Sequence, residues 1–146
     1  MNKITARWIH EHCNGKSVTL SSKTRLLHPF CKEIIANLSK ISVINFIKVT
    51  PDSVFASNEI SGYHEVPVSR PEHPTAIGVH VVLDFKHNLI EFVEINSAIK
   101  GYGQKMVSAV MGALPKDWQP TVVFDHSDGF WDKMKKEFAE VEWLEI

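Results

Sequence analysis

Apolar residues between Leu26 and Ile41 recur with the period of an α-helix. Residues three and four positions apart share one face of a helix, so this spacing predicts an amphipathic helix of about four turns. Pro29 fits such a helix only in its first turn, where its missing N–H has no intrahelical partner to lose. The stripe consists of Leu26, Leu27, Phe30, Cys31, Ile34, Ile35, Leu38 and Ile41.

The rest of the first half has weaker patterns. Ile4, Trp8 and Ile9 predict a short helix that ends at Asn14-Gly15. Residues 16–22 form either a short strand or an irregular connection. Residues 41–49 are rich in β-branched side chains and predict a strand. Residues 50–74 contain four prolines and few apolar positions. We therefore expect a long loop there, and such loops in compact domains are usually functional or mobile.

The second half is more regular. Two apolar segments, 76–85 and 89–96, flank a short polar stretch and predict an antiparallel hairpin. The next segment predicts a helix that Pro115 stops. The apolar face of this helix consists of Met106, Val107, Val110, Met111 and Leu114.

Three more elements complete the predicted order. Residues 120–125 predict a strand, residues 129–138 a helix capped by Ser127 or Asp128, and residues 141–146 a terminal strand. The whole order predicts a single α+β domain over residues 1–146. Its sheet is expected to be central and mostly antiparallel, with helices flanking it.

Composition fits a globular protein, since 44% of the 146 residues are hydrophobic and 23% are charged. The formal net charge of -1 provides no overall basic field for nucleic acid or an anionic membrane. No run approaches about 18 apolar residues, and the first residues lack the apolar core of a signal peptide. We therefore expect a cytoplasmic protein without a membrane partner.

Gly101 and Gly103 stand where the second hairpin segment leads into a helix. Without a Cβ, both residues let a ligand approach the backbone closely. The first amides of this helix, from Lys100 to Lys105, lack intrahelical partners and, with the helix dipole, suit a phosphate. A Rossmann site would need a further glycine in a parallel βαβ unit, and a P-loop would need a following Gly-Lys-Ser/Thr. The sequence has neither at this junction.

The junction resembles the acyl-CoA-binding motif of the GNAT acetyltransferase superfamily. In that family, a strand and a short loop precede Arg/Gln-x-x-Gly-x-Gly/Ala at the start of a helix, and residues 98–103 (AIKGYG) align with it without a gap. Val93 falls where the family has an apolar strand residue. Residues 130–138 (FWDKMKKEF) resemble the family's later Phe-Tyr-x-Lys-x-Gly-Phe segment. The resemblance covers residues 75–146, and the first half is compatible in element order.

The resemblance implies an N-acyltransferase that moves an acetyl group from its co-substrate acetyl-CoA to an unidentified amine. A base or a chain of waters near the thioester would deprotonate that amine. Side-chain alternation predicts that Glu91 and Glu94 face opposite sides of the sheet. Glu91 lies closer to the family's acidic position and is therefore the candidate base, with His80 and Asp84 as alternatives. The implied contacts to acetyl-CoA are Val93, Ile95, Lys100, Gly101, Tyr102, Gly103 and Gln104.

The chain departs from the family at three positions. Ala98 replaces the Arg or Gln that contacts phosphate, and Trp131 replaces the Tyr that often protonates the departing thiolate. The Gly before Phe138 is also absent, and the two tyrosines of the chain, Tyr63 and Tyr102, lie elsewhere. These departures favour a rival hypothesis, a non-catalytic GNAT-like module that binds CoA or a protein partner. A third option is a small α+β binding protein without a CoA site.

Other chemistry-bearing residues have simpler explanations. His10, His12 and Cys13 lack a fourth ligand, and positions two apart do not share a helix face, so we expect no metal site. Cys31 lies on the apolar stripe, which predicts a buried and unreactive thiol. The helical spacing of Trp131 predicts core packing.

Overall fold

The computed structural model describes residues 4–21, 28–62 and 65–145. Within these residues the chain forms four helices and six strands. The helices are α1 (Ala6–His12), α2 (Pro29–Ser39), α3 (Tyr102–Met111) and α4 (Phe130–Glu137). The strands are β1 (Ser17–Leu20), β2 (Phe46–Val49), β3 (Ser53–Ser57), β4 (Ile77–Asp84), β5 (Leu89–Ser97) and β6 (Gln119–Val122).

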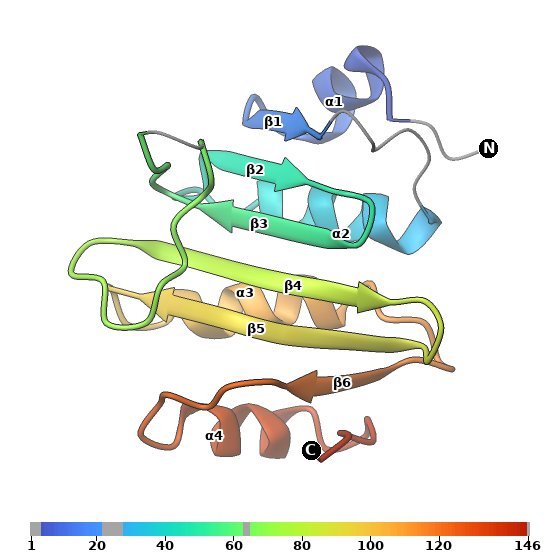
Figure 1. The fold of residues 1–146 in the computed structure, drawn as a ribbon, viewed down its shortest axis with the longest axis vertical. Coiled ribbons are helices and arrows are strands. Elements are labelled where there is room, and N and C mark those ends of the chain that lie inside the picture. Colours follow the sequence, from blue (N-terminus) through green and yellow to red (C-terminus); the bar gives the residue numbers. More distant parts are fainter. Residues whose placement is uncertain (1–3, 22–27, 63–64, 146) are drawn as a thin grey trace.

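All six strands form one mixed sheet whose spatial order follows the chain (Figure 1). The three central pairings, β2–β3, β3–β4 and β4–β5, are antiparallel, and the outer pairs β1–β2 and β5–β6 are parallel. Each parallel pair is joined through a helix, α2 in the first case and α3 in the second, as parallel pairing requires. The predicted α+β class with a mostly antiparallel sheet is therefore confirmed.

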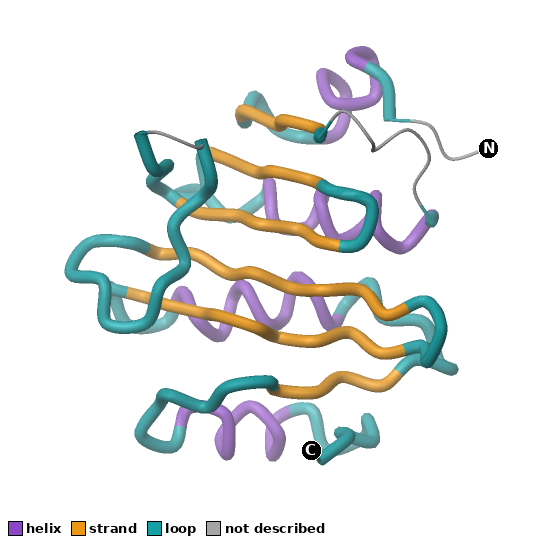
Figure 2. Tube along the Cα trace, viewed as in Figure 1, coloured by secondary structure: helices purple, strands orange, loops and turns teal. Residues whose placement is uncertain are grey.

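The core lies between the sheet and the helices α2 and α3, which share one face of it (Figure 2). Alternate residues of β4, from Ile77 to Leu83, point to this face and are at most 3% exposed. Met106, Val107 and Val110 of α3 are fully buried, as their spacing predicts. The Asn37 side chain of α2 donates to the carbonyl of Ala109 over 3.0 Å, which ties the two helices together.

Helix α2 begins as the sequence predicts, with Pro29 in its first turn. The ring of His28 caps it by accepting from the Phe30 amide over 3.3 Å. Its buried residues are Phe30, Cys31, Ile34, Ile35, Leu38 and Ser39. Leu26 and Leu27, which the predicted stripe includes, lie outside the described residues.

Several predicted boundaries are wrong. The strand expected over 41–49 begins only at Phe46, because the amides of Ile41 and Ile44 are bonded in turns, to the carbonyls of Leu38 and Ile41. The loop expected over 50–74 contains strand β3, whose short, proline-flanked sequence does not stand out. Helix α3 ends at Met111, before Leu114 and Pro115.

The chain end also differs from the prediction. The terminal strand expected over 141–146 is reduced to one parallel bridge, between Thr121 and Leu144. Helix α4 has Gly129 at its N-cap without a side-chain cap, instead of Ser127 or Asp128. The left-handed φ of 90° at Gly129 explains why glycine occupies this position.

Strand β5 contains a bulge that changes which side chains share a face. His80 pairs with Glu94, but its neighbour Val81 pairs with Phe92, so Val93 is an extra residue without a partner on β4. An extra residue reverses the alternation of side chains beyond it. The bulge therefore sets the faces of the last five residues of β5, from Val93 to Ser97.

The opposite face of the sheet is crossed by a segment that we call the strap, residues 65–76 (Figure 1). The strap is fastened to the chain beyond β3, because the Val68 amide donates to the Glu59 carbonyl over 3.0 Å. It passes so close to β4 that a Cβ at Gly78 would lie 2.1 Å from the Val68 carbonyl oxygen. Gly78 is therefore required by the crossing of the strap.

We expect Gly78→Ala to destabilise the protein by about 2 kcal/mol, since the added methyl group has to displace backbone atoms. Urea unfolding measures this as a lower midpoint with an unchanged slope. Gly62→Ala is the matched control, because its Cβ would have no neighbour within 4 Å. Equal midpoints for the two variants would contradict the close crossing.

Candidate functional site

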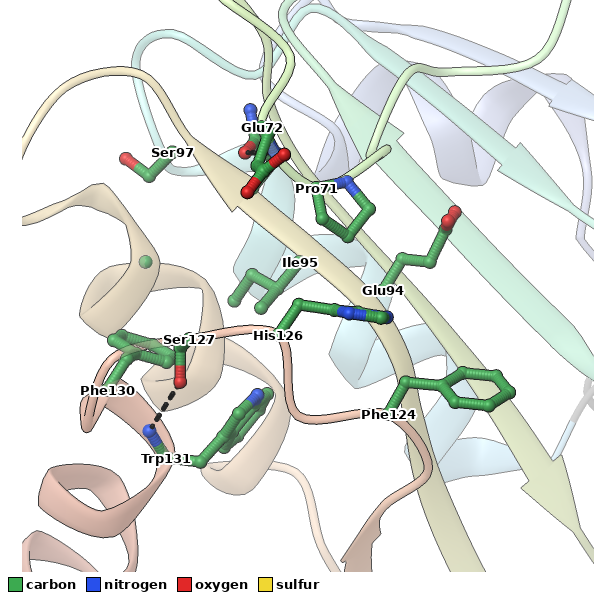
Figure 3. Close-up of a pocket in the computed structure, with 12 residues that line it drawn as sticks. Pro71, Glu72, Glu94, Ile95, Ser97, Phe124, His126, Ser127, Phe130 and Trp131 are labelled. Atoms are coloured by element: carbon green, nitrogen blue, oxygen red, sulfur yellow. Dashed lines mark hydrogen bonds between the residues drawn. The ribbon is translucent and has the colours of Figure 1, made fainter.

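A cavity of about 320 Å³ opens where the ends of β5 and β6 lie beside α4 and the strap (Figure 3). Its walls come from five parts of the chain. They are Pro71 and Glu72 of the strap, Glu94 to Ser97 of β5, Gly103 of α3, Phe124, His126 and Ser127 of the β6–α4 loop, and Phe130 and Trp131 of α4.

The cavity exists because two parallel strands part. Strand β5 pairs with β6 only from Leu89 to Phe92, and the amide of Val123 makes the last bond, to the Phe92 carbonyl over 3.0 Å. Strand β5 then continues to Ser97, whereas β6 has already ended at Val122. The parting begins at the Val93 bulge and leaves the last residues of β5 facing a gap. Crevices at the carboxyl ends of parallel strands commonly bind ligands.

The cavity reaches the first turn of α3, where Gly103 lines it. The N-cap of α3, Gly101, has a left-handed φ of 100° and makes no side-chain cap bond, so the first amides of the helix remain available to a ligand. Gly103 lines the cavity and also has a packing role. Its missing Cβ leaves room for the Phe130 ring, whose nearest carbon would lie 3.0 Å from that Cβ. Gly103 is therefore needed for packing, whatever approaches the backbone.

A second groove lies beside the same helix N-terminus. Gly101 and Gln104 line it together with two cationic side chains, Lys40 and Lys105. The Lys105 ammonium lies 4.9 Å from the centre of the Tyr102 ring. The side-chain amide of Gln104 donates to the Glu137 carboxylate of α4 over 2.5 Å. The groove thus combines the start of a helix with positive charge.

The residues expected to contact acetyl-CoA lie in different places, some in the cavity and some in the groove. Ile95 and Gly103 line the cavity, whereas Gly101 and Gln104 line the groove. Val93 is the extra residue of the bulge. Lys100 and Tyr102 lie at the α3 start and belong to neither set of lining residues.

Glu91 and Glu94 lie on the same face of the sheet, which contradicts the prediction from simple alternation. Glu91 pairs with Val82 and Glu94 pairs with His80, and these two partners are two residues apart on β4. Directly paired residues share a face, so the Val93 bulge has brought both glutamates to the side that the strap covers. Only Glu94 lines the cavity. Its carboxylate accepts a hydrogen bond from the buried Ser69 hydroxyl of the strap over 3.2 Å.

Asn96 fixes the strap at the cavity mouth. Its side-chain amide donates to the carbonyls of His73 (3.0 Å) and Ala76 (2.8 Å), and its oxygen accepts from the Glu72 amide (3.0 Å). Glu72 has a left-handed φ of 66°, which is uncommon for a residue other than glycine. Asn96 holds this conformation, and the Glu72 side chain reaches the cavity (Figure 3).

The β6–α4 loop supplies residues that sequence reasoning missed. Phe124 is 58% exposed and stacks near the His126 ring, with 6.0 Å between ring centres. The Ser127 hydroxyl donates to Asp125 over 2.7 Å and accepts weakly from the Trp131 amide at 3.4 Å. His126 follows a strand in parallel pairing. Ligands tend to bind at the carboxyl ends of such strands, and this tendency could have identified His126 from the sequence.

Trp131 packs in the core, as its spacing predicts. It is 2% exposed, and its ring centre lies 5.0 Å from that of Phe92 and 6.2 Å from that of Trp143. One part of it forms the cavity wall. Tyr63, one of the two tyrosines, lies outside the described residues.

The two alternative bases on β4 have other surroundings. Burial lowers the pKa of His80, although the charges of Glu94 and Asp52 oppose the shift. The His80 ring stacks on the Phe55 ring, with 3.9 Å between the ring centres. Asp84 belongs to the hairpin turn, where it accepts from the amides of Lys86 and His87. The hydrogen bond from the His87 ring is the largest cause of the lowered pKa of Asp84.

The remaining candidates give no second site. Burial raises the pKa of the Cys31 thiol to about 12, and Cys13 is also fully buried, so neither thiol is poised to react. Among residues 4–21, 28–62 and 65–145, no three His, Cys, Asp or Glu side chains gather closely enough to hold a metal ion. The helices in this part of the chain are all too short or too polar to cross a membrane.

Comparison with known proteins adds no assignment. No protein-family model matches the sequence, and neither a curated protein nor a solved structure is significantly similar to it.

Proposed function

We propose that this protein binds an acyl-CoA in the gap between β5 and β6 and transfers the acyl group to an amine, in the manner of the GNAT superfamily. The observation that carries the proposal is the parting of β5 and β6 at the Val93 bulge, beside the uncapped N-terminus of α3. This gap contains a cavity that can accept a narrow, flexible chain with amide groups, such as pantetheine. The motif residues 98–103 lie at the same place.

The cavity and the groove lie on either side of the α3 start and differ in charge, and this difference would orient a co-substrate that reached both. The α3 amides, the helix dipole and Lys40 and Lys105 favour the diphosphate on the groove side. Glu72 and Glu94 are the carboxylates of the cavity lining and favour a cationic amine on the strap side. The thioester would then lie between them, near the bulge.

The chemistry assigned to this site is direct attack by the amine on the thioester. Glu94 takes a proton from the bound ammonium, and the freed nitrogen lone pair forms a bond to the carbonyl carbon. The carbon–sulfur bond then breaks, and its electron pair leaves with the thiolate of CoA. The nitrogen gives its second proton to water as the amide forms. Ser69 holds the Glu94 carboxylate in place for the first step.

A second candidate function is acyl-CoA binding without transfer. The specific observation in its favour is Trp131, which fills the position of the family's acidic tyrosine with a buried indole. An indole N–H is a hydrogen-bond donor and too weak an acid to protonate a thiolate. Tight binding of acetyl-CoA with no transfer to any amine would favour this second function.

Binding of acetyl-CoA tests the proposed site. Acetyl-CoA at 100 times its dissociation constant is expected to stabilise the protein by about 2.7 kcal/mol, measured by thermal unfolding. Lys105→Glu is expected to weaken binding about tenfold, which corresponds to about 1.4 kcal/mol, because it repels the diphosphate. Lys116→Glu is the matched control, an exposed charge reversal outside both sets of lining residues.

Two outcomes would contradict the proposal at different levels. Absence of any stabilisation by acetyl-CoA would exclude both acyl-CoA functions. Equal losses of affinity in Lys105→Glu and Lys116→Glu would mean that the diphosphate lies elsewhere.

A further inference from the structure

The proposed transfer releases a thiolate into the cavity, and this thiolate needs a proton source. Most of the described lining residues that carry a polar hydrogen already donate it in a hydrogen bond. The Ser97 hydroxyl is bonded to the Ile99 carbonyl and the Ser127 hydroxyl to the Asp125 carboxylate. The Asn96 amide is bonded to the strap, and the Trp131 indole is too weak an acid.

His126 differs from all of these groups. Imidazole is the side chain that most often donates and accepts protons in general acid–base catalysis. The other titratable groups of the lining are Glu72 and Glu94, which accept protons when ionised. Among the described lining residues, His126 is therefore the one suited to give a proton to sulfur.

The position of His126 also suits this role. It lies on the loop after β6, across the gap from β5, and its ring points toward the part of β5 that carries Glu94 (Figure 3). His126 and the proposed base Glu94 thus lie on different walls of the gap. Phe124 beside the ring and Asp125 next to it in sequence are the nearest features of its own loop.

We propose that His126 is the general acid of the reaction, in place of the tyrosine that Trp131 replaces. This inference rests on the proposed acyl transfer. As the carbon–sulfur bond breaks, protonated His126 gives its proton to the departing sulfur, and CoA leaves as a neutral thiol. Glu94 has meanwhile accepted one proton from the amine. The nitrogen gives up its second proton as the amide forms, and this proton reaches His126 through water. Glu94 releases its proton to solvent, so one turnover converts the ammonium and the thioester into an amide, a thiol and one free proton.

The test compares His126→Gln and His126→Ala with the wild-type protein and with His10→Gln, an exposed histidine of α1 outside the cavity lining. Release of CoA thiol from acetyl-CoA is followed with a panel of primary amines that includes 1,4-diaminobutane and 4-aminobutyrate. We expect kcat to fall about 10²-fold in both His126 variants and to stay unchanged in His10→Gln. The dissociation constant of acetyl-CoA should stay within about twofold in all variants.

Chemical rescue separates an acid from a structural residue. Added imidazole is expected to restore part of the activity of His126→Ala and none of that of Glu94→Gln. Wild-type rates in His126→Gln would overturn the role of His126 and leave the proposed function standing. Loss of activity without rescue, or a parallel loss of acetyl-CoA affinity, would overturn it in favour of a structural role. Absence of turnover in the wild-type protein with every amine would overturn both.

Discussion

Replacing Glu94 with Gln is expected to lower kcat/KM for acyl transfer by about 10³-fold, because the amine then has no carboxylate to take its proton. Gln is nearly the same size, and its side-chain oxygen can still accept from Ser69. The cavity should therefore keep its shape, and the affinity for acetyl-CoA should change little. Steady-state kinetics together with thermal unfolding in acetyl-CoA measure both quantities.

Glu91→Gln is the matched control for this experiment. Glu91 is on the same strand and the same face, but it lies on the other side of the bulge and outside the cavity lining. We expect its rate to stay within about twofold of the wild-type rate. A large loss in Glu91→Gln with a small one in Glu94→Gln would restore the base that the family position indicates. Equal and small effects would mean that neither carboxylate is the base.

Replacing Val110 with Asp is expected to unfold the protein. Val110 is fully buried on the face of α3 that packs on the sheet, and the neighbouring core residues are apolar. An unpaired carboxylate placed there costs several kcal/mol, which is comparable with the total stability of a domain, about 5–15 kcal/mol. Far-ultraviolet circular dichroism and urea unfolding at neutral pH measure the loss.

Ser108→Asp provides the comparison on the same helix. Ser108 is exposed and is two residues away on the opposite side of α3, so its replacement is expected to change stability by at most about 0.5 kcal/mol. A Val110→Asp variant as stable as Ser108→Asp would show that α3 does not pack on the sheet through this face.

Much of the fold was predictable from the sequence because burial repeats locally. In α2 and α3 the buried residues recur with the helical period, and in β4 they alternate. Each pattern arises because one face of the element packs on the core, and each can be seen within a few turns or residues of the chain. Strand β3 was missed for a related reason. Its five residues are too few to show a period, and four of them are buried, so it lacks alternation.

The candidate site was predictable only in part. The glycines at the α3 start are local features, and the sequence alone placed them at a strand-to-helix junction. The resemblance of residues 98–103 to an acyl-CoA motif stays a prediction. The carboxylate assignment depended on strand alternation, and alternation holds only where no residue is inserted. Nothing in the sequence around Val93 marks it as the extra residue.

The sequence by itself determined the α+β class, the helices that form the core and the position of the Gly-x-Gly turn. Each of these depends on residues close together in the chain. Only the tertiary structure decided that Glu94 and His126 share a cavity, and that Glu91 lies outside it. The reason is that the bulge is defined by the register of β5 against β4. The parting of β5 from β6 is likewise defined by the residue at which their pairing stops. Both are relations between distant segments, which no local pattern records.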